Sequence, residues 1–212
     1  MLREFRREDL FISILDSGLR TLFARQPAAR PSPASKVEDA QLSPSERQAS
    51  IGLMRVNRAG EVSAQALYLG QSLFARSEAT RRQLLQAAAE EQDHLAWCSE
   101  RLEQLGGRRS LLDPIWYAGS VAVGMLAASG GDRRSLGFVA ETERQVEAHL
   151  EDHLARLPAG DPKSRAILNR MAADEAHHGT MAELAGGTDL PRPARLLMSI
   201  CGGILRRIAR FV

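Results

Sequence analysis

Apolar residues recur at three- and four-residue intervals along most of the chain, the spacing of helices that bury one face. No segment alternates apolar and polar residues for long enough to indicate a strand. The pattern predicts seven helices, at residues 10–23, 44–76, 78–105, 111–129, 133–157, 162–185 and 192–211. The sequence Ser43-Pro44-Ser45-Glu46 contains the cap, the first-turn proline and the glutamate of a capping box, which marks the start of the second helix. The predicted fold is therefore all-α.

Breaks in this pattern divide the chain into three parts. Residues 1–25 form an amphipathic N-terminal segment whose mixture of charged and apolar residues does not match a signal peptide. Residues 26–45 are rich in Pro, Ala and Ser, which indicates a linker that need not be ordered. Residues 46–212 hold the remaining helices and are long enough to bury a full core without disulfides.

Composition narrows the possible functions. Only 5% of the residues are aromatic, and the abundance of Ala, Leu, Glu, Arg and Gln favours helices over strands. The net charge of +2 gives no reason to expect nucleic acid as a partner. Cys98 and Cys201 are isolated, without Cys-x-x-Cys spacing, which favours a reducing cytoplasmic setting over a disulfide-bonded one.

The most informative motif is Glu-x-x-His, because it occurs twice. The two copies are Glu91-Gln92-Asp93-His94 and Glu175-Ala176-His177-His178. On a helix, positions i and i+3 point in similar directions, so each copy aims two metal-binding groups the same way. A lone glutamate lies on the preceding predicted helix in each half, Glu61 before the first copy and Glu143 before the second.

Position within the apolar stripe separates these residues from the other acidic residues, which are expected on solvated helix faces. Glu91 and His94 share a face with Leu84, Cys98 and Leu102; Glu175 and His178 with Leu168, Met171 and Met181; Glu143 with Val139, Val146 and Leu150; and Glu61 with Met54, Ala64 and Tyr68. Arg58 lies close to the Glu61 face and must be paired or pointed aside. Glu147, one turn beyond Glu143, is the nearest rival candidate.

Six such groups in a core indicate a pair of metal ions. Four buried carboxylates and two imidazoles would be very costly unless cations neutralised them. One Glu from each of two helices and Glu-x-x-His from each of two others is the ligand set of ferritin-like two-metal bundles. We therefore predict a ferritin-like four-helix bundle with residues 111–129 as an extra crossover helix and a C-terminal amphipathic helix. The predicted ligands are Glu61, Glu91, His94, Glu143, Glu175 and His178. This set, which lacks a thiolate, suits iron or manganese.

The remaining candidates are weaker. His177 is off the ligand face and is expected in solvent or behind the ligands. His149 could support a ligand or be an ordinary surface or packing residue, and His153 is expected on the surface. Cys98, one turn past His94, is expected in the core.

A second signal comes from Leu53-Met54-Arg55-Val56-Asn57-Arg58-Ala59-Gly60-Glu61, which resembles the L-R-V-N-x-A-G-E motif of the demethoxyubiquinone hydroxylase family. The segments Glu90–His94, Glu141–Val146 and Asp174–His178 resemble other blocks of its bacterial form. The resemblance runs from about residue 46 to the C-terminus. It implies a di-iron monooxygenase of ubiquinone biosynthesis, whose ligands would be the six residues chosen above.

The resemblance also implies the reaction components: two iron ions per chain, O2, an electron donor and a membrane-resident polyprenyl demethoxyubiquinol whose ring is hydroxylated. By analogy, Glu91 and Glu175 would bridge the irons, and Glu61 and Glu143 would be terminal ligands. A homo-oligomer and contacts with other ubiquinone-biosynthesis proteins stay open. Residues 1–45 lie outside the resemblance.

Two segments suggest contact with a membrane surface. Residues 114–131 contain no charged side chain, and we favour a crossover helix that dips into one leaflet over a core helix or a membrane span. Residues 195–212 combine apolar residues with Arg195, Arg206, Arg207 and Arg210, as in helices that lie on anionic lipid. Both favour a peripheral protein at the cytoplasmic face of the cell membrane.

Two other functions compete with this interpretation. A ferritin-like iron-storage or iron-oxidising protein would use the same ligands, but the apolar segments do not suit the exterior of a soluble cage. A helical lipid-binding adaptor without metal would leave the six ligand candidates unexplained.

Overall fold

The computed structural model describes residues 7–24 and 27–212, and this part of the chain contains helices and no strand. The helices are α1 (Arg7–Phe23), α2 (Pro44–Phe74), α3 (Glu78–Gln104), α4 (Asp113–Ser129), α5 (Asp132–Arg156), α6 (Pro162–Leu184) and α7 (Arg192–Ala209). The all-α prediction is confirmed, and the predicted helices are all present with ends shifted by a few residues. Residues 1–6 and 25 of the predicted N-terminal segment lie outside the described residues.

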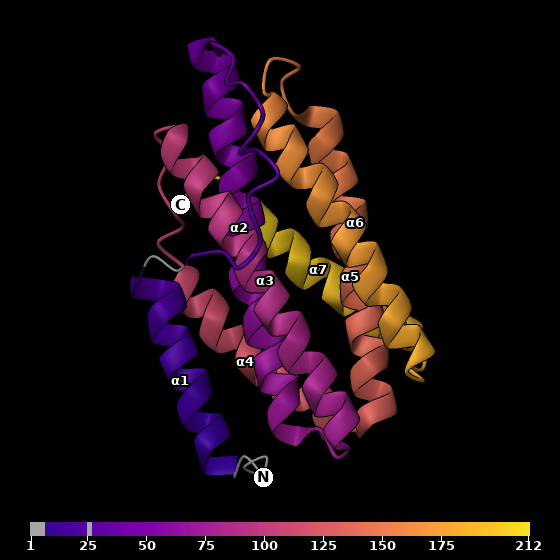
Figure 1. The fold of residues 1–212 in the computed structure, drawn as a ribbon. Helices are drawn as coiled ribbons and strands as arrows, with labels where there is room; N and C mark the ends of the chain where they lie inside the picture. Colours follow the sequence, from indigo (N-terminus) through magenta and orange to yellow (C-terminus); the bar gives the residue numbers. More distant parts are fainter. Residues whose placement is uncertain (1–6, 25–26) are drawn as a thin grey trace.

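The helices form two antiparallel pairs, α2 with α3 and α5 with α6, which stand side by side in Figure 1. Helix α4 packs along α2 and leads to α5, so it is the crossover between the two pairs. Helix α7 passes behind both pairs and contacts α2 and α5, and α1 lies along the outer side near α2 and α4. Two pairs joined by a long crossover form the predicted ferritin-like bundle.

Local sequence signals account for the helix ends. The capping box at the start of α2 is present: the Ser43 hydroxyl accepts from the Glu46 amide at 3.3 Å, and the Glu46 carboxylate accepts from the Ser43 amide at 2.9 Å. Helices α3 and α6 are followed by glycines with positive φ, 76° at Gly106 and 94° at Gly186. An L side chain would be strained at either position, so both glycines end their helices.

The crossover helix approaches α2 closely because each helix presents a glycine to the backbone of the other. A Cβ atom at Gly124 would collide with the Leu67 carbonyl, and one at Gly70 would collide with the Val121 carbonyl. The opposite face of α4 remains uncovered, with Ile115 61% and Leu126 72% exposed. Among the described residues, no helix is long and apolar enough to cross a membrane.

Residues 27–43, the described part of the predicted linker, contain no helix but pack against the bundle. Ala34 is buried beside Trp97 and Leu102, and Leu42 packs against the same apolar cluster. The Asp39 carboxylate pairs with the buried Arg101 at 3.1 Å. This segment is therefore attached to the folded unit along α3, whereas the predicted domain boundaries themselves stay a prediction.

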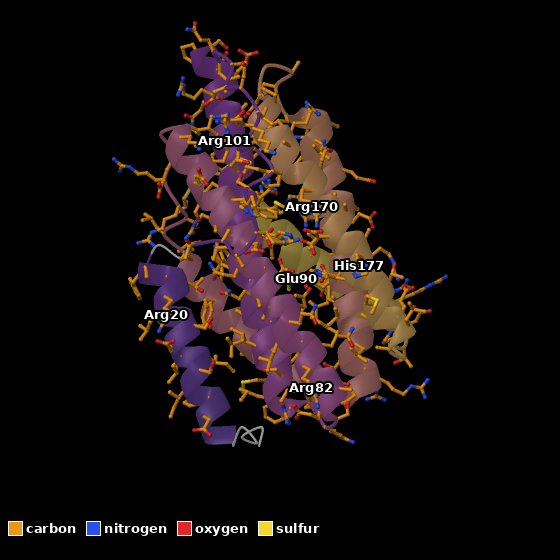
Figure 2. All side chains as sticks on the ribbon, in the orientation of Figure 1. Arg20, Arg82, Glu90, Arg101, Arg170 and His177 are labelled. Atoms are coloured by element: carbon orange, nitrogen blue, oxygen red, sulfur yellow. The ribbon has the colours of Figure 1, made fainter. Side chains whose placement is uncertain are left out.

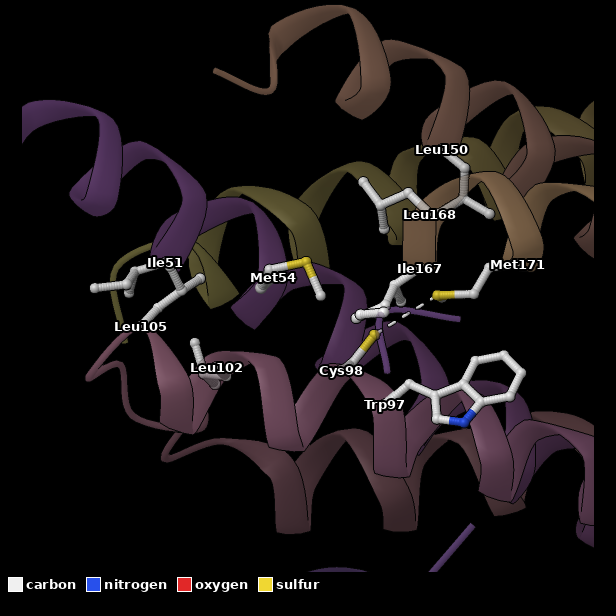
Figure 3. Packing of buried hydrophobic residues seen from close by; sticks show 11 residues of the cluster. Ile51, Met54, Trp97, Cys98, Leu102, Leu105, Leu150, Ile167, Leu168 and Met171 are labelled. Carbon is white, nitrogen blue, oxygen red and sulfur yellow. Dashed lines mark hydrogen bonds between the residues drawn. The ribbon is translucent and has the colours of Figure 1, made fainter. Parts of the chain in front are cut away.

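The core consists mainly of two apolar clusters at different heights in the bundle. The Trp97 cluster comprises Ala34, Ile51, Met54, Trp97, Cys98, Leu102, Leu105, Leu150, Ile167, Leu168 and Met171 (Figure 3). The Leu84 cluster comprises Ile14, Ala64, Tyr68, Leu69, Ala75, Leu84, Ala88, Val139, Ala140 and Ala182. On all four bundle helices the stretch between the two clusters carries the glutamates and histidines chosen from sequence. The core thus has a polar layer between two apolar ones.

Candidate metal centre

All six predicted ligands are buried in this polar layer. Glu91 and His94 are 0% exposed, and the least buried of the six, His178, is 8% exposed. Helix α2 supplies Glu61, and α5 supplies Glu143, while α3 and α6 each supply a Glu-x-x-His pair. Arg58, which lies near Glu61 in sequence, is paired as predicted: it binds the carboxylate of Asp113 and donates to the Ser99 hydroxyl at 2.9 Å. It does not contribute to the polar layer.

The ligand atoms form two groups that share two glutamates. One group contains Glu61, Glu91, His94 and Glu175, and the other contains Glu91, Glu143, Glu175 and His178. Within each group the atoms lie within 4.8 Å of one another. Glu91 and Glu175 belong to both groups, so these two carboxylates are placed where they could contact two ions at once.

Both histidines direct the same ring nitrogen at the carboxylates. The Nδ1 atom of His94 lies 3.1 Å from Glu91 and 3.2 Å from Glu175. The Nδ1 atom of His178 lies 3.2 Å from Glu175 and 3.6 Å from Glu91. Nδ1 is therefore the nitrogen of each ring that is available to a metal.

The other ring nitrogen faces a carboxylate from the opposite half of the duplication. His94 Nε2 lies 3.0 Å from Asp174, and His178 Nε2 lies 2.6 Å from Glu90 (Figure 2 labels Glu90). An Nε2–H donated to these carboxylates leaves Nδ1 unprotonated for a metal and fixes the ring orientation. Sequence reasoning missed both residues, although each is the acidic residue directly before a motif glutamate.

Tyr68 is a further polar residue of the centre. It is fully buried, and its hydroxyl donates to the Glu143 carboxylate. Burial, together with the charges of Glu143, Glu91 and Glu175, raises the pKa of Tyr68 well above its usual value. The phenol therefore keeps its proton and holds Glu143 in place. The apolar stripe placed Tyr68 on the ligand face but did not identify this bond.

Burial governs the electrostatics of the layer. It raises the pKa values of Glu61 and Glu143 well above the usual range, and neighbouring carboxylates add to the effect. Burial alone would also raise the pKa of Glu175, but hydrogen bonds from His178 and His94 outweigh it and lower that pKa to about 2. Burial opposes charge on His178, yet Glu175 and Glu91 raise its pKa to about 9. The layer needs positive charge, which metal ions supply when they displace these protons.

One orphaned atom tests whether a metal pair fits this layer. The Oε1 atom of Glu91 is buried and has no hydrogen-bond partner in the described part of the chain, since His178 Nδ1, 3.6 Å away, is too far for a hydrogen bond. A buried carboxylate oxygen without a partner is costly, and a cation between the two ligand groups would satisfy it. Carboxylates and imidazoles without a thiolate suit iron or manganese. Cys98, as expected, is a core residue that contacts Met171 at 3.7 Å (Figure 3).

The other histidines differ in their surroundings. His177 is exposed on α6 (Figure 2). His149 stacks edge-on against His153, with ring centroids 3.9 Å apart. This contact is with another histidine of α5 and not with a predicted metal ligand. The prediction that His153 is a surface residue is wrong: it is 3% exposed, and its Nδ1 lies 2.9 Å from Asn57 of α2. Helix α2 covers the edge of the α5 stripe, which the periodicity of α5 alone cannot indicate.

A large cavity lies outside the candidate metal centre. It has a volume of about 730 Å³ between the end of α1, residues 27–32 and the outer face of α3. Trp97 forms part of its wall and also contacts His94, with ring centroids 5.4 Å apart. The indole therefore separates this cavity from the ligands.

These features define the class: a ferritin-like helical bundle whose core holds two adjacent groups of carboxylates and imidazoles that could bind metal. The family model described as ubiquinone biosynthesis protein COQ7 matches residues 48–206. The chain belongs to this family, which confirms the resemblance found in its motifs.

Curated relatives named 3-demethoxyubiquinol 3-hydroxylase match nearly the whole chain. The protein of Burkholderia multivorans is 53% identical over 205 residues, which cover 96% of this chain and 99% of the relative. The protein of Paracidovorax citrulli is 50% identical over 204 residues, covering 96% and 100%. The protein of Xanthomonas campestris pv. campestris is 53% identical over 191 residues, covering 90% and 88%.

Proposed function

We propose that this chain is a di-iron monooxygenase that uses O2 to hydroxylate the ring of a polyprenyl demethoxyubiquinol (2-polyprenyl-3-methyl-6-methoxy-1,4-benzoquinol) in ubiquinone biosynthesis. The observation that carries the proposal is the pair of ligand groups that share Glu91 and Glu175, since shared carboxylates suit two adjacent ions. The substrate class comes from the relatives, which are named 3-demethoxyubiquinol 3-hydroxylase.

The side chains divide into those that hold iron and those that hold the ligands. Glu61 and His94 would bind one ion, Glu143 and His178 the other, and Glu91 and Glu175 both. When bound and reduced, the iron pair supplies the reaction with O2. Asp174 and Glu90 orient the two imidazoles through Nε2, and Tyr68 restrains Glu143. The apolar clusters above and below exclude water from the layer.

The proposed substrate is a lipid, so we propose that the protein works on a membrane surface, at the cytoplasmic face of the cell membrane. Helix α7 buries only Ala209 fully among its residues. Five of its large apolar side chains are at least a third exposed: Leu196, Leu197, Ile200, Ile204 and Ile208. Arginines on the same helix suit anionic headgroups. The uncovered face of α4 adds Ile115, Val123 and Leu126.

Iron loading and turnover of the purified protein test the catalytic part of this proposal. We expect two irons per chain after anaerobic loading, and ring hydroxylation that requires both O2 and a reductant. Glu143→Ala should abolish hydroxylation, whereas Glu147→Ala, one turn further along α5 and outside both ligand groups, should retain it. Uptake of many more than two irons per chain without a hydroxylated quinone would instead establish iron storage.

Liposome binding tests the membrane part. Replacing Leu197, Ile204 and Ile208 together with Ser should release the protein from anionic vesicles, because each inserted apolar side chain contributes roughly 1.5–3 kcal/mol. Leu184→Ser, at the exposed end of α6, serves as the control. Unchanged binding of the triple variant, with unchanged helix content, would rule out α7 as the contact.

A further inference from the structure

Residues 27–43, here called the strap, follow the outside of α3 toward the start of α2. The Ala29 amide donates to Asp93 of α3 at 2.6 Å, and the Trp97 indole N–H donates to the Arg30 carbonyl at 3.3 Å. Further along, Asp39 pairs with Arg101 of α3. The strap is thus fastened to α3 at two levels, and the first level coincides with the metal centre.

Arg30 connects the two helices that carry the Glu-x-x-His motifs. Its Nε atom lies 2.6 Å from Asp93 of α3, and its Nη1 atom lies 2.9 Å from Asp174 of α6. The guanidinium also stacks over the Trp97 ring, 4.9 Å from its centroid. Asp93 is 3% and Asp174 is 9% exposed, so a cation here compensates two buried carboxylates.

The contact with Asp174 leads directly to a ligand. The Oδ2 atom that accepts from Arg30 is also the atom nearest to His94 Nε2, at 3.0 Å. A planar guanidinium held by Asp93 and Trp97 fixes the position of that oxygen. Arg170 also pairs with Asp174, with Nη2 2.8 Å from Oδ1 and Nε 3.2 Å from Oδ2, but it lies on the preceding turn of the same helix, so it does not connect α6 to α3.

The other half of the centre is built differently. Glu90, which faces His178 Nε2, has a side chain that is 31% exposed and receives a hydrogen bond from Gln86 at 3.0 Å. The strap contacts the His94 side, through Asp93, Asp174 and Trp97. The two sites of the proposed pair therefore have different outer surroundings.

We propose that the strap is part of the metal centre and that Arg30 is a positioning residue for His94. By holding Asp174 against Nε2, Arg30 fixes the imidazole whose Nδ1 binds metal. It thereby raises the metal affinity of the Glu61, Glu91, His94 and Glu175 site selectively over that of the other site. This inference rests on the proposed paired-metal centre and assigns a role to a segment that precedes the part of the chain matched by the family model.

The test compares wild-type protein with Arg30→Ala, Arg30→Gln, Arg30→Lys and the control Lys36→Ala, an exposed strap residue. Anaerobic Fe(II) binding is measured by competition with a chelator, and the two irons are distinguished by Mössbauer spectra of samples loaded with ⁵⁷Fe. Apo-protein helix content and thermal unfolding monitor the fold. We expect Arg30→Ala and Arg30→Gln to weaken Fe(II) binding at one site about tenfold, which is the usual loss when a residue that orients a metal ligand is removed. The Mössbauer spectrum of only one of the two irons should change.

Arg30→Lys should recover part of the loss, because an ammonium can pair with Asp174 but cannot form the fork to both carboxylates. Lys36→Ala should match wild type. Equal weakening of both sites, or wild-type affinity in folded Arg30→Ala and Arg30→Gln, would overturn the positioning role while leaving the proposed enzyme intact. Wild-type protein that binds no pair of ions would overturn both.

Discussion

The ligands on α2 and α3 lie beneath the strap, which contacts Asp93 of α3. In the other half, formed by α5 and α6, the group that faces Nε2 of the ligand His178 is Glu90, whose side chain is partly exposed. His94 is 0% exposed and His178 8%. The halves agree in ligand type and spacing and differ in what surrounds the ligands. The duplicated spacing thus places equivalent carboxylate and imidazole atoms where they could bind metal, while the groups that surround those ligands differ between the halves. We therefore expect two ions with unequal affinities.

The strongest test of the comparison removes a glutamate that both halves share. Glu91→Ala should abolish most binding at both sites, because Glu91 belongs to both ligand groups. Glu61→Ala should affect mainly one site and leave about one ion per chain, since Glu61 belongs to one group. Metal analysis after anaerobic loading and gel filtration measures the difference. A Glu91→Ala protein that keeps one tightly bound ion would show that the halves are independent.

A smaller effect on metal affinity is expected for the two carboxylates that face the Nε2 atoms of the histidines, Asp174 and Glu90. Asp174→Asn should weaken metal binding about 10–100-fold, because the buried carboxylate holds His94. Glu90→Gln should cost less, since solvent reaches the Glu90 side chain and screens its contact with His178. Chelator competition on both variants gives the two losses. Equal losses would contradict the claim that the two surroundings differ.

A separate effect, on acid stability and not on metal binding, is expected in the second half. Burial lowers the pKa of His149 to about 2 and that of His153 to about 3, with nearby His153 and arginines adding to the effect. The unfolded chain takes up these protons below about pH 6.5, and the folded chain does not until near pH 3. Stability should therefore fall as pH decreases through this window, by on the order of 2 kcal/mol per histidine at pH 5.

His153→Gln should reduce this loss, because glutamine can still donate to Asn57 but does not titrate. Urea unfolding at pH 7 and pH 5 compares it with wild type and with His177→Gln on the exposed face of α6. The charged groups nearest the pair, Asp152, Arg156, Arg206 and Arg210, are unchanged in these variants. An equal pH dependence in all three proteins would exclude the histidine pair as the cause.

The helices and the six buried ligand candidates were predictable because each depends on local order in the sequence. Periodicity identifies the buried face of a helix, and a charged residue on that face needs a compensating partner. A capping box and glycines with positive φ then fix the helix ends. The same reasoning places the six residues in one layer, and their binding of metal stays a prediction.

Contacts between distant segments were not predictable in this way. Arg30 lies in a proline-rich segment without periodicity, and its partner Asp174 is far away in sequence. His153 lies beside the α5 stripe and is buried by contacts between helices, among them the one with Asn57 of α2. Asp174 and Glu90 did carry a signal, since an acidic residue directly precedes the glutamate of both motifs. An acidic residue at the same position in both motifs, just off the ligand face, indicates a carboxylate that orients the histidine of the other motif.

The crossing of these carboxylates has a consequence for how such a centre can arise. Asp174 of the second half serves the histidine of the first, and Glu90 of the first half serves the histidine of the second. A single helical hairpin with this sequence pattern would contain a Glu and a Glu-x-x-His but would lack the carboxylate behind its own imidazole. Only a second hairpin, packed in the antiparallel sense, supplies it. Such a centre can therefore form only when both hairpins are present and packed together, because each hairpin supplies the carboxylate that orients the imidazole of the other.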